Sequence, residues 1–202
     1  MSDGGSPIAG VARRDAPARH MPGEEGIWLF IFGDMMVFTL FFVAFAWVRG
    51  EQVEVFRAAQ AQLSQFFGAL NTFYMLTSSW FVASAVRASR SGDRRMTVAG
   101  FAGGFLCAFG FGVNKWFEYG DKVRAGLTPM TNDFFMYYYV FTGIHFMHVI
   151  IGMGVLAYMA HYARTARSLD ARTIRNLESG ASFWHVVDLL WIVLFALLYL
   201  AP

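Results

Sequence analysis

Five long apolar stretches, separated by polar and charged connections, set the pattern of this chain. They run over residues 27–48, 66–86, 96–116, 134–161 and 182–201. Each is about 20 residues or longer, which at roughly 1.5 Å per residue lets a helix cross the hydrocarbon core of a bilayer. None shows the alternation of a barrel strand, and only helices and closed barrels satisfy the backbone in hydrocarbon. The pattern therefore predicts an all-α integral membrane bundle of five transmembrane helices.

The first 25 residues differ from the rest, because they are small, polar, rich in glycine and proline, and carry Arg13, Arg14 and Arg19. The first apolar stretch is as long as a membrane span and longer than the apolar region of a cleaved signal peptide, so we do not expect it to be one. We expect residues 1–25 to form a disordered cytoplasmic tail and residues 26–202 a single five-helix domain. The connection at residues 51–65 fits either a short amphipathic helix at the outer surface or a plain loop.

Positive charge alternates between the connections. Eleven arginines lie in the tail and in the second and fourth connections: Arg13, Arg14, Arg19, Arg87, Arg90, Arg94, Arg95, Arg164, Arg167, Arg172 and Arg175. The opposite side is assigned five basic residues, Arg49, Arg57, Lys115, Lys122 and Arg124. Because cytoplasmic loops carry the excess of arginine and lysine, this predicts a cytoplasmic N-terminus and a periplasmic C-terminus.

Composition agrees with the membrane class. Hydrophobic residues make up 56% of the chain and aromatic residues 18%, which is too apolar for an ordinary soluble domain. The single cysteine, Cys107, excludes a disulfide framework and a cysteine-based metal site. A Gly-x-x-x-Gly pair at Gly100 and Gly104 allows close helix approach, and packing within the bundle is its ordinary use.

Polar residues within the apolar stretches are the candidate functional groups, because an ionisable residue at membrane depth is costly and needs a partner. The predicted main cluster consists of Asp34, His145, His148, His185 and Asp188, all of which can be placed in the inner half of the bundle. His145 and His148, and likewise His185 and Asp188, are three residues apart and share helix faces. Asn71, Thr72 and Glu118 lie toward the outside and form a second, smaller polar group.

Four interpretations of the main cluster stay open. The polar groups hold the helices in register by interhelical hydrogen bonds. They bind a lipid headgroup or a partner helix. They hold a metal or haem, since His-x-x-His beside carboxylates resembles known metal sites, although no full set of ligands is visible. Or they relay protons or ions, although broken helices and inverted repeats typical of transporters are missing.

Five local motifs, in order along the chain, resemble the subunit III family of haem-copper oxidases. They are Gly26-Ile-Trp-Leu-Phe-Ile-Phe-Gly-Asp34, Leu70-Asn71-Thr72, Lys115-Trp-Phe-Glu-Tyr119, Phe141-Thr-Gly-Ile-His-Phe-Met-His-Val149 and Phe183-Trp-His-Val-Val-Asp-Leu-Leu-Trp191. Lys115 stands where the family pattern has glutamine, and Asp34 where its main branch has glutamate. The family's first two helices have no counterpart here. That short form, with Asp34 and the Pro22-Gly23-Glu24 lead-in, looks most like the variants encoded with bacterial nitric oxide reductases.

The resemblance implies a non-catalytic subunit that supports the assembly, stability or proton uptake of a catalytic subunit in aerobic respiration or denitrification. It implies no haem or metal of its own, a bound phospholipid, and a place in the bacterial inner membrane. The expected partners are the catalytic subunit of a haem-copper oxidase or nitric oxide reductase and membrane lipids, not nucleic acid. The alternatives are a stand-alone transporter or assembly factor for the nitric oxide reductase or copper pathway, and an independent membrane metalloenzyme.

Overall fold

The computed structural model describes residues 25–200, so the predicted disordered tail lies outside the described residues. The elements are α1 (Glu25–Glu51), α2 (Val53–Gln60), α3 (Gln65–Arg90), α4 (Arg94–Arg124), α5 (Asp133–Thr165) and α6 (Ala171–Phe195), followed by a π-helical turn, η1 (Ala196–Leu200). Residues 25–200 contain no strand. The all-α prediction is confirmed.

Side-chain caps explain where three of the long helices begin. The carboxylate of Asp93 accepts a hydrogen bond from the Met96 backbone N–H at 3.0 Å, Asn132 accepts one from Phe135 at 3.0 Å, and Asp170 accepts one from Thr173 at 2.8 Å. Such caps satisfy N–H groups that have no partner within the helix. Gly92 and Gly126 follow the ends of α3 and α4 with φ of +77° and +76°, a conformation that glycine adopts without steric cost.

Two predicted spans are too short. The stretch 96–116 belongs to a helix that continues to Arg124, and the stretch 182–201 belongs to one that begins at Ala171. Both extensions are polar turns that hydropathy leaves out, although backbone hydrogen bonding and capping continue the helix through them. Lys115 and Lys122, counted above among the basic residues of the opposite side, therefore both lie within α4. Residues 53–60 form the short amphipathic helix that was one of two interpretations of that connection.

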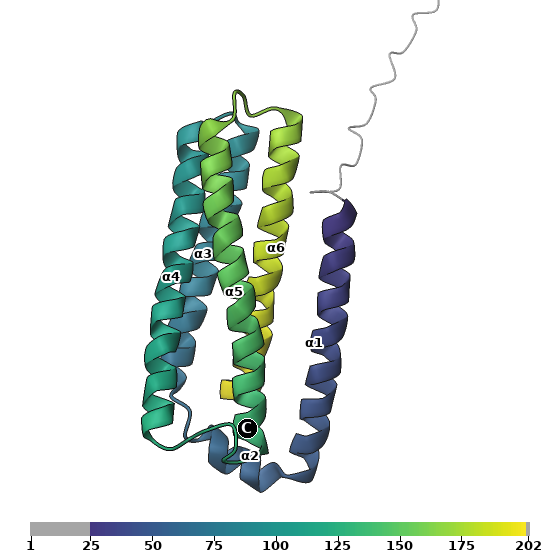
Figure 1. Cartoon of the computed structure of the whole chain (residues 1–202), viewed down its shortest axis with the longest axis vertical. Helices are drawn as coiled ribbons and strands as arrows, with labels where there is room; N and C mark the ends of the chain where they lie inside the picture. The colour runs from purple at the N-terminus through teal and green to yellow at the C-terminus, as the bar shows by residue number, and fades with distance from the viewer. Residues whose placement is uncertain (1–24, 201–202) are drawn as a thin grey trace, which may run out of the picture.

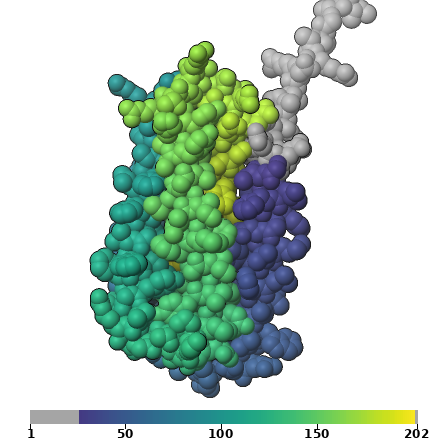
Figure 2. Space-filling model, in the orientation of Figure 1, coloured from purple at the N-terminus to yellow at the C-terminus, as the bar shows by residue number. Residues whose placement is uncertain are grey.

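Helices α3 to α6 form an up-and-down bundle, and α1 runs along one side of it (Figure 1). Figure 2 shows that side chains fill the space that the ribbons leave between α1 and the bundle. Only 17% of the most apolar part of α1 is buried, the lowest share among the four most apolar long helices. Its C-terminal half packs through aromatic rings: Phe45 lies 5.6 Å from Tyr137 and 5.5 Å from Phe56 between centroids, and Phe42 lies 5.6 Å from Phe141.

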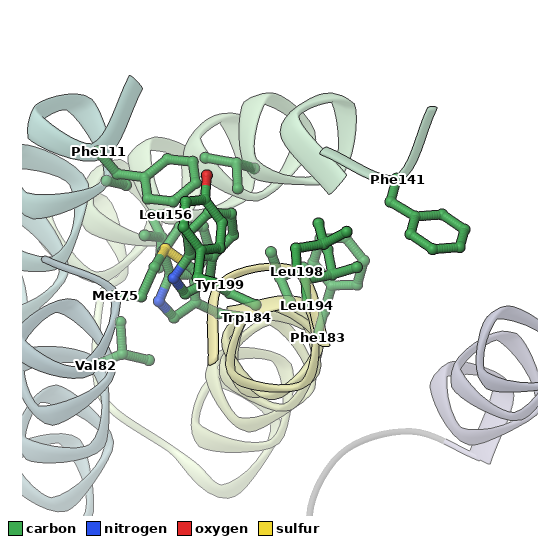
Figure 3. Packing of buried hydrophobic residues seen from close by; sticks show 14 of the residues in the cluster. Met75, Val82, Phe111, Phe141, Leu156, Phe183, Trp184, Leu194, Leu198 and Tyr199 are labelled. Carbon is green, nitrogen blue, oxygen red and sulfur yellow. The ribbon is translucent and has the colours of Figure 1, made fainter. Parts of the chain in front are cut away.

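The core of the bundle is aromatic and closely packed. Trp184 and Tyr199 of α6 and η1 lie buried among residues such as Met75 and Phe111 from the other helices (Figure 3), and Trp191 of α6 is fully buried in the same core. Glycines permit this packing. A Cβ added at Gly100 would lie 2.7 Å from the Cβ of Ala85, and one at Gly152 would lie 2.6 Å from the Trp184 ring. The predicted use of Gly100 and Gly104 for packing within the bundle is confirmed.

Four of the described helices are long and apolar enough to cross a membrane: Gly26–Glu51, Arg94–Arg124, Asp133–Thr165 and Ala171–Leu200. Helix α3 is also long enough, with 26 residues, but it is less apolar than these four. Polar residues lower its hydropathy: Asn71, Thr72, Thr77, Ser78, Ser79 and Ser84. The structure is thus that of a multi-pass membrane protein. Length and composition support four of the five predicted spans, and the span over α3 is not supported in this way.

Candidate functional site

Asp34 and His148 form a polar contact between α1 and α5. Oδ1 of Asp34 lies 3.1 Å from Nε2 of His148, and the two side chains are 14% and 10% exposed. The other ring nitrogen, Nδ1, lies 2.8 Å from the carbonyl oxygen of Ile144. Because a carbonyl oxygen only accepts, Nδ1 carries a hydrogen, and Nε2 is the ring nitrogen that faces the carboxyl group of Asp34.

His185 and Asp188 face α3 instead. Nδ1 of His185 lies 2.6 Å from the hydroxyl of Ser79, which joins α6 to α3. Asp188 is 6% exposed, and its Oδ1 has no hydrogen-bond partner within the described part of the chain.

His145 lies in the interior between α4, α5 and α6. It is fully buried, its ring centroid is 5.8 Å from Phe111 and 5.3 Å from Trp191, and neither ring nitrogen has a hydrogen-bond partner among residues 25–200. The five predicted residues therefore do not share one hydrogen-bonded cluster: Asp34 contacts His148, His185 contacts Ser79, and His145 lies among aromatic rings.

The residues of the second predicted polar group form interhelical contacts of their own. The amide of Asn114 donates to Oδ1 of Asn71 at 2.7 Å, which joins α4 to α3. The indole N–H of Trp191 donates to the hydroxyl of Thr72 at 3.0 Å, which joins α6 to α3. Each bond satisfies a polar group that would otherwise lie unpaired in the interior.

Glu118 is the acceptor in the most polar site of the interior. Lys115 donates to its Oε2 at 2.9 Å, and Tyr138 donates to its Oε1 at 2.8 Å. The hydroxyl of Tyr199 also donates to Oε1. Lys115 and Glu118 are each 1% exposed. The ion pair and two tyrosine hydroxyls bind α4, α5 and η1 together near one end of the bundle.

The ammonium group of Lys115 is enclosed by rings as well as by oxygens. Its Nζ lies 3.2 Å from the hydroxyl of Tyr138 and 3.1 Å from that of Tyr199. It also lies 4.9 Å from the ring centroid of Tyr138 and 5.2 Å from those of Tyr119 and Trp191. Aromatic faces attract cations, so this cage favours the charged lysine.

Sequence reasoning identified Glu118 but missed its partners. The signal for Lys115 was its spacing of three residues from Glu118, which puts both on one face of a helix. The third predicted span ends at residue 116, before Glu118, so the span alone does not indicate the pair. Tyr138 and Tyr199 carry no comparable signal, since tyrosine is common in apolar stretches.

Within residues 25–200, no three His, Cys, Asp or Glu side chains lie close enough together to bind one metal ion. The imidazoles of His148 and His185 instead bond to a carboxylate and a hydroxyl. Within these residues the arrangement joins helices to one another in a multi-pass helical membrane protein.

Comparison with known proteins identifies the family. The family model described as cytochrome c oxidase subunit III matches residues 19–201. The chain belongs to this family.

Individual relatives are distant but cover most of the chain. This chain is 28% identical over 184 residues to cytochrome c oxidase subunit 3 of Synechocystis, and the alignment covers 87% of this chain and 74% of the relative. It is 25% identical over 178 residues to cytochrome bo(3) ubiquinol oxidase subunit 3 of Pseudomonas putida, covering 87% and 84%. Heme-copper oxidase subunit I+III of Aeropyrum pernix is 24% identical over 182 residues, and the chain spans 22% of its length.

Proposed function

We propose that the chain is a non-catalytic accessory subunit of a haem-copper respiratory enzyme in the bacterial inner membrane. It supports the assembly, stability or proton uptake of the catalytic subunit. The observation that carries this is the family match over residues 19–201. The name of the Aeropyrum relative, subunit I+III, joins this type of subunit to a subunit I in one protein, which supports a direct partnership with the catalytic subunit.

The contacts inside the bundle support a structural role. The Lys115–Glu118 ion pair and the Asp34–His148 contact each pair polar groups within the chain. Buried polar groups paired in this way specify how helices pack, and they leave the apolar outer surface for lipid and for the partner. In this role the chain needs no haem or metal of its own.

The proposal includes five spans with the N-terminus in the cytoplasm. Helix α3 packs along α4 over most of its length, from Ala85 against Gly100 to Asn71 against Asn114, so it crosses wherever α4 crosses. When the buried Lys115 is left out, eleven basic residues on the predicted cytoplasmic side stand against four on the opposite side, so the excess still predicts a cytoplasmic N-terminus. A reporter enzyme active only in the periplasm should be active when fused after residue 200 and inactive when fused in the 91–93 turn. The reverse result would contradict the orientation.

The finer proposal is that the partner is a nitric oxide reductase of a denitrifying bacterium, and it rests on Asp34, which stands where the family's main branch has glutamate, and on the Pro22-Gly23-Glu24 lead-in. The test is to isolate the respiratory enzyme from cells with and without this chain and to measure consumption of oxygen and of nitric oxide. We expect an unchanged haem spectrum and a severalfold lower yield of stable enzyme without the chain. Equal yield and equal stability under turnover would contradict the accessory role, and the gas consumed identifies the partner's substrate.

A further inference from the structure

The two ends of the bundle differ sharply in charge. The end formed by residues 87–95 and 164–178 holds eight arginines and three carboxylates. At the other end four basic residues, Arg49, Arg57, Lys122 and Arg124, stand against four acidic residues, Glu51, Glu54, Asp121 and Asp133. The first end thus carries a large positive excess and the second end is balanced.

The three carboxylates of the basic end are already engaged. Asp93 and Asp170 accept hydrogen bonds from the first turns of α4 and α6, so these helix N-termini are capped by the chain itself. The bonds from Thr173 hold the pKa of Asp170 below its ordinary value, which keeps it ionised near neutral pH. Glu178, 3% exposed, pairs with Arg90 at 2.7 Å.

Arg94 fixes the geometry of this end. Its two terminal nitrogens donate to the carbonyl oxygens of Arg164 and Arg167 at 3.3 and 3.2 Å. These bonds hold the turn between α3 and α4 beside the connection between α5 and α6 (Figure 1). Arginines from all four helices of the bundle are therefore gathered around one end.

Six of these arginines form what we call the arginine rim: Arg87, Arg95, Arg164, Arg167, Arg172 and Arg175. All six are exposed, and none forms an ion pair with a described residue. The rim contains no lysine, since the only two lysines of the chain, Lys115 and Lys122, lie toward the other end of α4. Guanidinium groups bind phosphate oxygens through paired hydrogen bonds, which an ammonium group cannot form in the same geometry.

We propose that the arginine rim binds the phosphate groups of anionic phospholipids. The rim lies at the ends of the apolar helices, at the level where a bilayer presents its headgroups. Its arginines come from four different helices and the connection between α5 and α6, and all are exposed, so they fit several headgroups of a lipid surface better than a single free phosphate ion. This inference does not depend on which enzyme the chain accompanies.

The test uses the purified full chain in detergent, titrated with phosphatidylglycerol or phosphatidylcholine and followed by native mass spectrometry. We expect phosphatidylglycerol to bind more tightly. The double variant Arg95→Gln/Arg175→Gln should lower that affinity about tenfold or more, since each arginine near a membrane surface contributes roughly fivefold. The matched control at the other end, Arg57→Gln/Arg124→Gln, should keep the affinity of the original chain.

Three results would overturn the proposal. Full affinity of the rim double variant for phosphatidylglycerol would show that the rim does not bind it. Loss of as much affinity in the control as in the rim variant would show that only the overall charge matters. Complete displacement of the lipid by an excess of inorganic phosphate would identify a soluble phosphate ligand instead.

Discussion

Replacing Lys115 with methionine is expected to destabilise the chain by about 3–5 kcal/mol, the usual cost of removing one partner of a buried ion pair. Methionine has nearly the same length and stays apolar, so packing around Trp191 changes little. Glu118 would remain 1% exposed with only the two tyrosine hydroxyls as donors. The measurement is thermal unfolding of the purified protein in one detergent, where we expect a drop of many degrees in Tm.

A second variant separates the lost charge pair from lost packing. The double variant Lys115→Met/Glu118→Gln has no buried charge at this site, and its amide oxygen still accepts from Tyr138 and Tyr199. It should recover most of the lost stability, because replacing both partners of a buried pair is often neutral. Two results would contradict a stabilising ion pair at this site. One is a Lys115→Met variant as stable as the original chain, and the other is a double variant less stable than both Lys115→Met and Glu118→Gln alone.

Asp34→Ala should weaken the attachment of α1 and lower the yield of the assembled respiratory complex without changing any haem spectrum. The substitution leaves Nε2 of His148 without its partner at a depth where water is scarce, at a cost of about 1–3 kcal/mol. The effect on α1 should be large because so little of this helix is buried. Asp34→Asn keeps a hydrogen-bonding group at the same position and should behave much more like the original chain.

The matched control for Asp34 is Thr39→Ala. Thr39 is an exposed residue of the same helix, and its hydroxyl donates at 2.7 Å to the Met35 carbonyl within α1. Its removal should leave complex yield unchanged. Normal yield and normal stability of the Asp34→Ala complex would show that the Asp34–His148 contact is unimportant for assembly.

Hydropathy predicted the helices because apolar length is a property of the sequence alone. The fourth stretch, 134–161, lies within α5 at Asp133–Thr165, and its start follows the Asn132 cap. The method failed where a helix continues through polar turns, as α6 does from Ala171. Those turns are stabilised by the Asp170 cap and by the Arg90–Glu178 pair, and the second of these depends on another helix.

Partners of the buried polar residues could not be predicted in the same way, because they depend on how each helix is rotated. His145 and His148 are three residues apart on α5, yet one lies against Phe111 and Trp191 and the other against Asp34. Spacing gives the shared side of a helix but not the neighbouring helix. The reverse holds for Lys115 and Glu118, whose spacing does predict the pair once the true end of α4 is known.

The most direct test of the central claim, that this chain is an accessory subunit, is to identify what co-purifies with a tagged copy. The copy is extracted gently from its native membrane, and the bound proteins are identified by mass spectrometry. We predict recovery of a haem-bearing catalytic subunit in near-stoichiometric amount. Recovery of the chain alone, under conditions that keep a known oxidase intact, would contradict the claim and favour a stand-alone transporter or assembly factor.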